Sequence, residues 1–343
     1  MHQDRHDYRD RKYLSAVEAA RFLETTVEEI HRLGRENHIL MHRASSGQQR
    51  FDLDSLIHLA DSSSPNTISR GTRLNIGKTV QKVICADASH MKDLNDESVH
   101  LVVTSPPYFN AKMYSSPSID GDLGNVHSVE EWLERIALIW KEVFRVLQPG
   151  RKAFINIMNL PVRLGGGSYR TLNLAGRTID LCEEIGFIFK RDIVWHKTNG
   201  VRAPIGTYPF PGGILLNNMH EFILELEKPM PEKTSKYSHV TPEDREASRL
   251  DKEFWLSIKN SDVWLMNPEG SGDQRDHVAP FPLTLPSRLI RAFSYRQETI
   301  LDPFCGSGTT LVAASRLGRN GVGYEITPDI ASHSIMRLKQ ENK

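Results

Sequence analysis

The chain has 343 residues, with 43 basic and 43 acidic side chains and a formal net charge of zero. This length suits one large α/β domain with a small additional module, and an apolar content of 39% excludes a wholly disordered chain. Balanced charge excludes a polycationic protein but allows a local basic surface. The three cysteines, Cys85, Cys182 and Cys305, lack the paired spacing of disulfide frameworks or zinc sites, so no metal is expected.

The first dozen residues are charged and contain histidine, so residues 1–12 are expected to form a flexible lead-in. No apolar segment follows them, in contrast to a signal peptide, and no apolar run in the sequence has membrane-spanning length. We therefore expect a cytoplasmic protein in a reducing compartment, without a membrane partner.

Residues 13–61 predict a small module of two short helices followed by a β-hairpin. Ser15 and Glu18 have the spacing of a capping box at the start of the first helix. Thr25 or Thr26 suits the start of the second helix, and a Ser-Ser-Gly turn at residues 45–47 separates two segments that predict the hairpin.

This order resembles the winged helix-turn-helix of the excisionase and MerR-type DNA-binding family. The points of similarity are residues 14–23 and the wing at residues 47–51 with its closing helix. The resemblance implies that Arg43 and Arg50 contact DNA. A helical protein-interaction or dimerisation module is the alternative interpretation.

Residues 62–76 are small, polar and proline-bearing, which predicts a linker, and residues 77–343 predict the main domain. Apolar runs that favour strands alternate there with amphipathic segments that favour helices. This alternation indicates the α/β class with a doubly wound, mostly parallel sheet covered on both faces. The expected strands are residues 83–86, 99–103, 153–157, 187–195, 221–226, 300–301 and 321–324, and the expected helices are 128–146, 172–185, 285–293 and 309–317, with a last one from 328. The polar segment 228–249 predicts a long loop, and Trp195, Trp255 and Trp264 are expected in the core.

Residues 302–310 read Asp-Pro-Phe-Cys-Gly-Ser-Gly-Thr-Thr, between a strand and a helix. Gly306 and Gly308 allow a tight turn and let a ligand approach the backbone at the start of the helix. Glu325 ends the next strand, where a doubly wound fold places the carboxylate that accepts ribose hydroxyls. The absence of a Lys-Ser/Thr pair after the glycines disfavours a Walker phosphate loop. The pattern therefore predicts a nucleoside-bearing cofactor, while helix–strand packing alone would also explain the glycines.

Residues 104–108 read Thr-Ser-Pro-Pro-Tyr directly after the strand predicted at 99–103. The two prolines end that strand at the edge where open α/β sheets bind ligands. An ordinary proline turn would give the same pattern, and the downstream glycine motif is what favours a functional interpretation.

In this order, the two motifs resemble those of the amino-methylating (N4-cytosine/N6-adenine) DNA methyltransferases of the permuted β class. These enzymes carry Ser/Asp-Pro-Pro-Tyr ahead of Asp-Pro-Phe-x-Gly-x-Gly-Thr, and the resemblance here extends over roughly residues 80–340. It implies a Rossmann-like methyltransferase fold with S-adenosyl-L-methionine as the cofactor. The residues implied in cofactor binding are Asp302, Phe304, Gly306, Gly308, Thr309, Glu325, Asp87 and Phe281.

The same resemblance implies that Ser105, Pro106, Pro107 and Tyr108 are catalytic. The Ser105 hydroxyl and the Pro106 carbonyl can accept hydrogen bonds from the exocyclic amine of a base and aim its lone pair at the methyl group. Tyr108 offers an aromatic face for a base extruded from the duplex. No Pro-Cys pair occurs in the sequence, so methylation at cytosine C5 is not expected.

Serine at position 105 favours cytosine N4 as the target, because Ser-Pro-Pro-Tyr usually accompanies cytosine methylation in this family and Asp-Pro-Pro-Tyr adenine methylation. Methylation of adenine N6 by the same machinery is the alternative. A non-catalytic DNA-binding regulator with a methyltransferase fold is a second alternative from another functional class.

Double-stranded DNA is the expected partner, recognised by a segment at about residues 198–276. Three residues here are expected to contact DNA. Lys197 ends the strand before this segment and could touch DNA phosphate, and Arg202 and Tyr208 lie in its loop rich in glycine and proline and could insert into DNA. A purely structural loop is the alternative for the last two residues. A cognate restriction endonuclease of a restriction-modification system and a second copy of the chain in a homodimer are further candidate partners.

Overall fold

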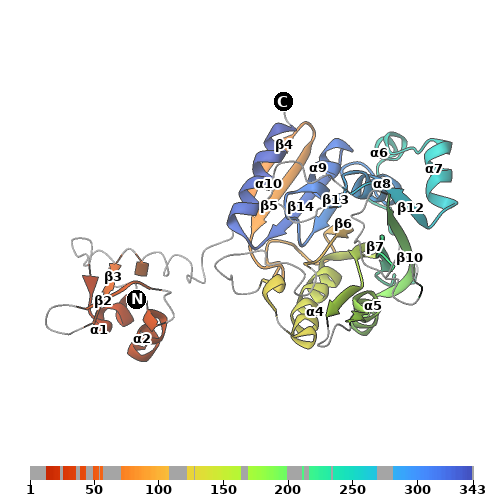
Figure 1. The fold of residues 1–343 in the computed structure, drawn as a ribbon. Coiled ribbons are helices and arrows are strands. Elements are labelled where there is room, and N and C mark those ends of the chain that lie inside the picture. Colours follow the sequence, from red (N-terminus) through yellow and green to blue (C-terminus); the bar gives the residue numbers. More distant parts are fainter. Residues whose placement is uncertain are drawn as a thin grey trace. The chain divides into compact units, whose positions relative to one another are not determined.

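In the computed structural model the chain forms two compact units, Met1–Arg70 and Gly71–Lys343 (Figure 1). The structure describes residues 13–23, 26–35, 39–43, 49–53, 55–56, 71–107, 122–126, 128–163, 169–198, 211, 216–232, 235–268 and 281–341. Among these residues, no helix combines the length and the apolar character needed to cross a bilayer.

The described residues of the small unit contain helices α1 and α2, further helical positions at Leu53, Ser55 and Leu56, and a three-stranded antiparallel sheet in the order β1-β3-β2. The elements are β1 (Tyr13–Leu14), α1 (Ala16–Phe22), α2 (Val27–Arg35), β2 (Met41–Arg43) and β3 (Gln49–Asp52). The predicted capping box is confirmed, since the Ser15 N–H donates to Glu18 Oε2 at 2.8 Å and the Glu18 N–H to Ser15 Oγ at 3.3 Å. The sequence did not predict β1, which is too short to show an alternating pattern.

The large unit is built on a nine-stranded sheet, as far as the structure describes it, in the order β12-β10-β11-β7-β6-β13-β14-β5-β4. Its strands are β4 (Thr72–Ile76), β5 (Thr79–Cys85), β6 (Val99–Thr104), β7 (Leu147–Ile157), β10 (Ile188–Lys197), β11 (His220–Glu227), β12 (Val263–Met266), β13 (Thr299–Asp302) and β14 (Asn320–Glu325). A separate hairpin pairs β8 (Leu160–Arg163) with β9 (Tyr169–Leu172).

Most neighbouring strands of this sheet are parallel. The run β7-β6-β13-β14-β5 is parallel throughout, as is the pair β10 and β12, whereas β4 and β11 run antiparallel to their neighbours. The expected mostly parallel α/β sheet is therefore confirmed, with antiparallel additions. Because parallel strands end at the same edge, the carboxyl ends of β6, β13, β14 and β5 lie side by side.

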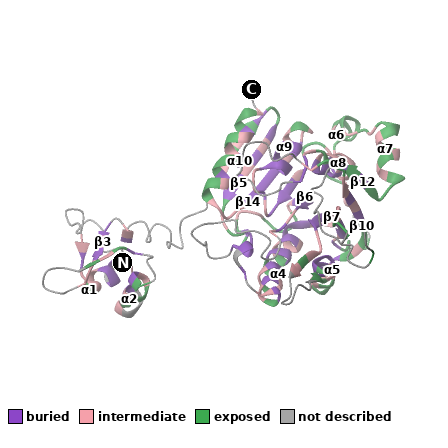
Figure 2. Ribbon diagram, in the orientation of Figure 1, coloured by how far each residue is buried: buried purple, intermediate pink, exposed green. Residues whose placement is uncertain are grey.

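Helices cover both faces of the sheet. They are α4 (Val129–Val146), α5 (Leu174–Ile185), α6 (Pro242–Ala247), α7 (Lys252–Lys259), α8 (Thr284–Phe293), α9 (Thr309–Arg316) and α10 (Pro328–Gln340), and a short 3₁₀ turn η2 (Leu123–Asn125) precedes α4. Helices α4 and α5 pack against one face, and α8, α9 and α10 against the other. Figure 2 shows the central strands buried between these layers and α7 largely exposed.

Three local expectations differ from the structure. Strand β4 pairs with β5 and occupies residues assigned to the linker, because its alternating polar pattern suits an exposed edge. The segment expected as a long loop contains α6, whose start is capped when Thr241 Oγ1 accepts the Asp244 N–H at 3.0 Å. Trp255 is not a core residue, since it is 48% exposed on α7, whereas Trp195 and Trp264 are buried as expected.

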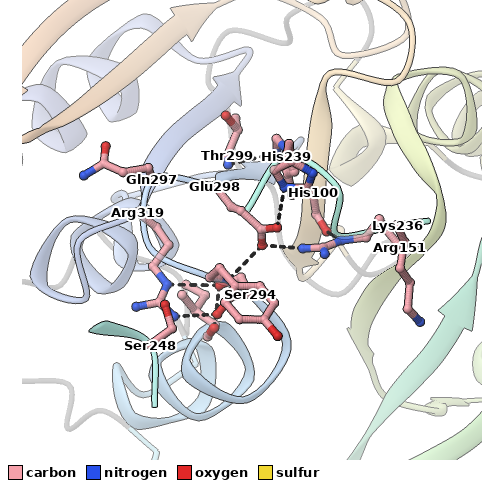
Figure 3. A network of polar contacts seen from close by, with 12 residues as sticks. His100, Arg151, Lys236, His239, Ser248, Ser294, Gln297, Glu298, Thr299 and Arg319 are labelled. Carbon is pink, nitrogen blue, oxygen red and sulfur yellow. Dashed lines mark hydrogen bonds and ion pairs between the residues drawn. The ribbon is translucent and has the colours of Figure 1, made fainter. Parts of the chain in front are cut away.

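An ion network closes the amino-terminal edge of the sheet (Figure 3). Glu298, just before β13, is buried and ion-paired with the equally buried Arg151 of β7. His239 Nε2 lies 2.9 Å from the other oxygen of the Glu298 carboxylate. Burial, with Arg151 and His239 nearby, lowers the pKa of His100 to about 4, although the Glu298 carboxylate opposes this shift.

His100, His239 and Glu298 lie close enough together to suggest a metal site. However, His100 Nδ1 accepts the Thr299 N–H at 3.1 Å, so a neutral His100 carries its proton on Nε2. The Arg151 guanidinium also occupies one oxygen of Glu298. These partners engage the groups that a metal would need, which favours a structural ion network.

Candidate active site

The two motifs that lie far apart in the sequence meet in the sheet. Strands β6 and β13 are parallel neighbours, with Val102 aligned with Leu301. At their carboxyl ends the Thr104 hydroxyl donates to Asp302 Oδ1 at 2.6 Å, a bond between residues 198 positions apart. The Pro-Pro motif and the glycine motif therefore begin from the same point of the sheet edge.

Asp302 is the carboxylate at this junction, and it is 2% exposed. In addition to Thr104, the Thr310 hydroxyl donates to its Oδ2 at 2.6 Å and the Phe304 N–H to its Oδ1 at 3.1 Å. Burial raises the pKa of Asp302 to about 6, although these hydrogen bonds act in the opposite direction. The carboxylate thus holds β6, β13 and α9 together through donors that carry no charge.

The Pro-Pro turn is fixed from the side of α4. Ser105 and Pro107 are partly buried and Pro106 is buried, directly after the end of β6. The Trp132 indole N–H donates to the Pro107 carbonyl at 3.1 Å. Tyr108 lies outside the described residues, so its expected stacking role stays a prediction.

The glycine turn has the backbone that its sequence predicts. Gly306 and Gly308 have φ values of +50° and +82°, in the region that favours glycine. A Cβ at Gly308 would overlap the Ser334 side chain, whereas a Cβ at Gly306 would come no closer than 4.0 Å to another atom. Gly308 is therefore required for packing, and Gly306 leaves the backbone open to a ligand.

Glu325 lies across the turn at the end of β14. Its Oε2 accepts the Gly306 N–H at 3.1 Å, and its Oε1 accepts the Thr327 N–H at 2.9 Å. Burial raises its pKa and the charge of Asp302 adds to this effect, while the two backbone donors lower it. The buried Asp302 carboxylate, the partly buried Glu325 carboxylate and an open glycine turn at the start of a helix fit a cationic, ribose-bearing cofactor.

The other residues expected at the cofactor have varied surroundings. Phe304 packs edge-on against Trp140 of α4, with ring centroids 5.9 Å apart. Thr309 Oγ1 accepts a hydrogen bond from Arg337 Nη1 of α10 at 2.8 Å. Phe281 is buried in the core cluster beside α8. Asp87 is exposed just past β5, and its Oδ1 accepts the Ser89 N–H at 2.8 Å.

The structure describes only some of the expected DNA-contacting residues. The Lys197 ammonium lies 2.5 Å from a Glu221 carboxylate oxygen and 5.3 Å from the centre of the Trp195 ring. Arg50 is partly buried on β3 of the small unit. The side chain of Arg43 and all of Arg202 and Tyr208 lie outside the described part of the chain.

Sequence reasoning missed four residues that shape this site: Thr104, Thr310, Trp132 and Arg337. The two threonines lie inside the motifs, so their hydroxyls could have been proposed as partners of Asp302. Trp132 and Arg337 lie on helices where their spacing predicts only packing or exposure. Their contacts with the two turns depend on how those helices dock.

The chain is similar to known DNA methylases over most of its length. The DNA methylase family of N6- and N4-methyltransferases matches residues 99–336. Type II methyltransferase M.MjaI of Methanocaldococcus jannaschii is 34% identical over 283 residues, which are 72% of this chain and 88% of that protein. Type II methyltransferase M.MthZI of Methanothermobacter thermautotrophicus is 31% identical over 268 residues, which are 73% of this chain and 74% of that protein.

Solved structures resemble the large unit as well. A candidate DNA modification methylase of Thermus thermophilus, in complex with S-adenosyl-L-methionine, has a TM-score of 0.59 and 33% identity and covers 76% of this chain and 95% of its own. The cytosine-N4-specific PvuII DNA methyltransferase has a TM-score of 0.56 and 20% identity over 77% of this chain and 90% of its own. At that identity the second likeness concerns the fold alone.

Proposed function

The chain belongs to the N6/N4 family of DNA methylases, and from this premise we propose that it methylates the exocyclic N4 of cytosine in duplex DNA. The observation that carries the proposal is the junction of the two motifs, where Thr104 of the Ser-Pro-Pro strand donates to Asp302 of the glycine motif. In chain order the Pro-Pro motif precedes the glycine motif, which is the arrangement of the permuted β class.

S-adenosyl-L-methionine is the cofactor of this family and supplies an activated methyl group when it is bound. In this chain, the Gly306 backbone is open at the start of α9, and the Glu325 carboxylate faces the same turn. We assign the ribose hydroxyls to Glu325, the adenine amino group to Asp87 and the neighbouring packing to Phe281. Asp302 favours a cationic ligand by its field, because its oxygens are engaged with Thr104 and Thr310.

The reaction asks the protein to position a weakly nucleophilic amine. The Ser105 hydroxyl and the Pro106 carbonyl accept hydrogen bonds from the amine, which draws its lone pair out of the ring system. Pro107 holds the turn rigid, and the bond from Trp132 fixes its carbonyl. Tyr108 stacks on the extruded base. No covalent bond to the enzyme is needed.

Serine at position 105 is the basis for choosing cytosine over adenine. A neutral hydroxyl can accept from the amine and donate to the adjacent ring nitrogen, which suits the N4–N3 edge of cytosine. Adenine N6 presents the same pair of groups, so it remains the alternative target.

We propose that the small unit is a winged helix-turn-helix that adds affinity for duplex DNA. Its two helices and the β2–β3 hairpin support this proposal. Recognition of the target DNA sequence would come mainly from the segment at residues 198–276. Deletion of residues 1–70 is expected to weaken DNA binding while methyl transfer remains, and unchanged affinity, target choice and assembly would contradict this role.

The test of the proposed function is methyl transfer to unmethylated plasmid DNA from radiolabelled S-adenosyl-L-methionine, followed by mass spectrometry of the nucleosides. N4-methylcytosine is the expected product. N6-methyladenine would retain the enzyme class and overturn the target base, and no labelled product would favour a non-catalytic regulator. Sequencing of modified bases in the host genome would then give the recognition site. A nuclease that cuts the same unmethylated site would support a restriction-modification role.

A further inference from the structure

Three polar side chains continue the sheet edge on the side of Ser105 that faces away from the glycine turn. They are Asn156 on β7, Glu221 on β11 and Lys197 on β10, and we call them the amide triad. Asn156 Nδ2 donates to Glu221 Oε2 at 2.5 Å, and Lys197 Nζ lies 2.5 Å from Glu221 Oε1. Glu221 therefore links a neutral amide to a cation.

The strand register places the amide triad next to the catalytic turn. Thr104 of β6 is aligned with Ile155 of β7, so the next residues along the two parallel strands are Ser105 and Asn156. Neighbouring strands are about 4.8 Å apart. Phe154 packs in the same cluster as Val103, and side chains alternate along a strand, so Asn156 points to that face.

The orientation of the Asn156 amide follows from its partner. A carboxylate accepts hydrogen bonds and cannot donate them, so Glu221 requires the amide nitrogen of Asn156 on its side. Lys197 balances the charge of Glu221 at the same time. An amide fixed in this way presents its donor and acceptor in one order only.

Burying these polar and charged side chains costs free energy, so packing alone does not explain them. Asn156 is 2% exposed and Glu221 is 6% exposed. Apolar residues of similar volume at such positions are often at least as stabilising as a buried ion pair. The triad also lies at the carboxyl edge, where open α/β sheets bind ligands. These points favour recognition of a ligand.

We propose, resting on the function proposed above, that Asn156 contacts the ring edge of the extruded base and that Glu221 and Lys197 are its positioning residues. The substrate class is a base with an exocyclic amine beside a ring nitrogen, which cytosine and adenine share. In one fixed orientation, the amide oxygen accepts from the exocyclic amine and the amide N–H donates to the ring nitrogen. Thymine presents a carbonyl and a ring N–H at these positions, which such an amide does not complement. Lys197 thus acts through Glu221 and not as a contact to DNA phosphate.

Glu225 provides a matched control for Glu221. It lies four positions further along β11, aligned with Phe154 of β7, is 5% exposed and is ion-paired with Lys152. Glu221→Gln and Glu225→Gln each neutralise one buried carboxylate that is paired with a lysine. Only the first change touches the amide triad.

The experiment measures kcat and KM for plasmid DNA from a methylation-deficient host, with tritiated S-adenosyl-L-methionine, for the unaltered chain and for Asn156→Ala, Glu221→Gln, Lys197→Met and Glu225→Gln. Asn156→Ala is expected to lower kcat/KM for DNA about 10- to 100-fold, and Glu221→Gln and Lys197→Met less. The Kd for the cofactor should stay within about two-fold in all variants, and Glu225→Gln should keep kcat/KM within the same range.

The outcomes separate this inference from the proposed function. No transfer by the unaltered chain would overturn both. Transfer by the unaltered chain together with near-normal kcat/KM for Asn156→Ala would overturn the inference alone. Equal losses for Glu221→Gln and Glu225→Gln would also overturn it, because general destabilisation would then explain both. If Asn156→Ala melts below the assay temperature, the difference in kcat/KM between Glu221→Gln and Glu225→Gln tests the inference instead.

Discussion

The two ends of strand β13 each carry a buried carboxylate, and their surroundings differ in kind. Glu298 at the amino end and Asp302 at the carboxyl end are both 2% exposed. Glu298 is paired with the Arg151 guanidinium and the His239 ring. Asp302 is held by the hydroxyls of Thr104 and Thr310 and by a backbone N–H.

Under the proposed function, this difference distinguishes a stabilising edge of the sheet from a catalytic one. At the amino edge the Arg151 guanidinium balances the charge of Glu298, and this buried pair closes the core. At the carboxyl edge neutral donors position Asp302, and burial raises its pKa to about 6 although these donors lower it. A cationic cofactor would supply the balancing charge at that edge.

The largest effect is expected from breaking the amino-edge pair. Arg151→Met leaves Glu298 buried without its guanidinium partner, and such a change costs about 3–5 kcal/mol of unfolding free energy. Chemical denaturation measures this loss. Methyl transfer per folded molecule should be retained below the melting transition, and a selective loss of kcat would show that the amino edge takes part in the reaction.

Ser105→Ala, in contrast to Arg151→Met, should change kcat and leave stability unaltered. Loss of a hydroxyl that holds the amine in the transition state is expected to lower kcat about 10²–10³-fold, with stability and cofactor affinity retained. Single-turnover methyl transfer and equilibrium cofactor binding check this on the same preparation. Normal kcat in this variant would remove Ser105 from the catalytic role.

Asp302→Asn tests whether Asp302 causes the expected pH dependence of cofactor affinity. The folded-state pKa of Asp302 is raised to about 6 from an ordinary 3.8, so the cofactor-free fold takes up a proton as pH falls through 6 and gains stability from this group. A cationic cofactor prefers the ionised form, so its affinity should fall by up to about ten-fold per pH unit below 6. Calorimetric titrations between pH 5 and 8, chosen around the value of about 6, should show this slope in the unaltered chain and not in Asp302→Asn. A slope that persists in the variant would assign it to another group.

His100 should give a pH dependence of stability with the opposite sign. Its folded-state pKa is lowered to about 4, so the unfolded chain binds the proton first and stability is lost as pH falls below 6.5. In His100→Asn this contribution, at most about 1.4 kcal/mol per pH unit, should disappear. Thermal melts across this range measure it, with Asp302→Asn as the control from the other edge. An unchanged pH dependence would show that His100 is not the group that titrates.

The sequence predicts the parallel sheet and both motifs because their signals are local. Apolar runs predict β5, β6 and β13, and the glycines at 306 and 308 predict the turn with positive φ that the structure contains. The meeting of Thr104 and Asp302 could be expected from the resemblance, since both residues end strands that must lie side by side.

The remaining contacts depend on how distant elements dock. Nothing local to Trp132 indicates a bond to the Pro107 carbonyl, and Arg337 reaches the glycine turn only because α10 packs beside it. The amino-edge network escaped prediction for the same reason, since Arg151 and Glu298 are 147 positions apart and neither belongs to a motif. Trp255 was expected in the core, yet it is 48% exposed on α7.

A crystal structure of the chain with S-adenosyl-L-methionine would test directly whether the carboxyl edge of β6, β13 and β14 is the active site. The ribose hydroxyls are expected on the Glu325 carboxylate, and the transferable methyl group is expected to face Ser105. A cofactor bound at another edge of the sheet, or one at this edge without contact to Glu325, would contradict this assignment.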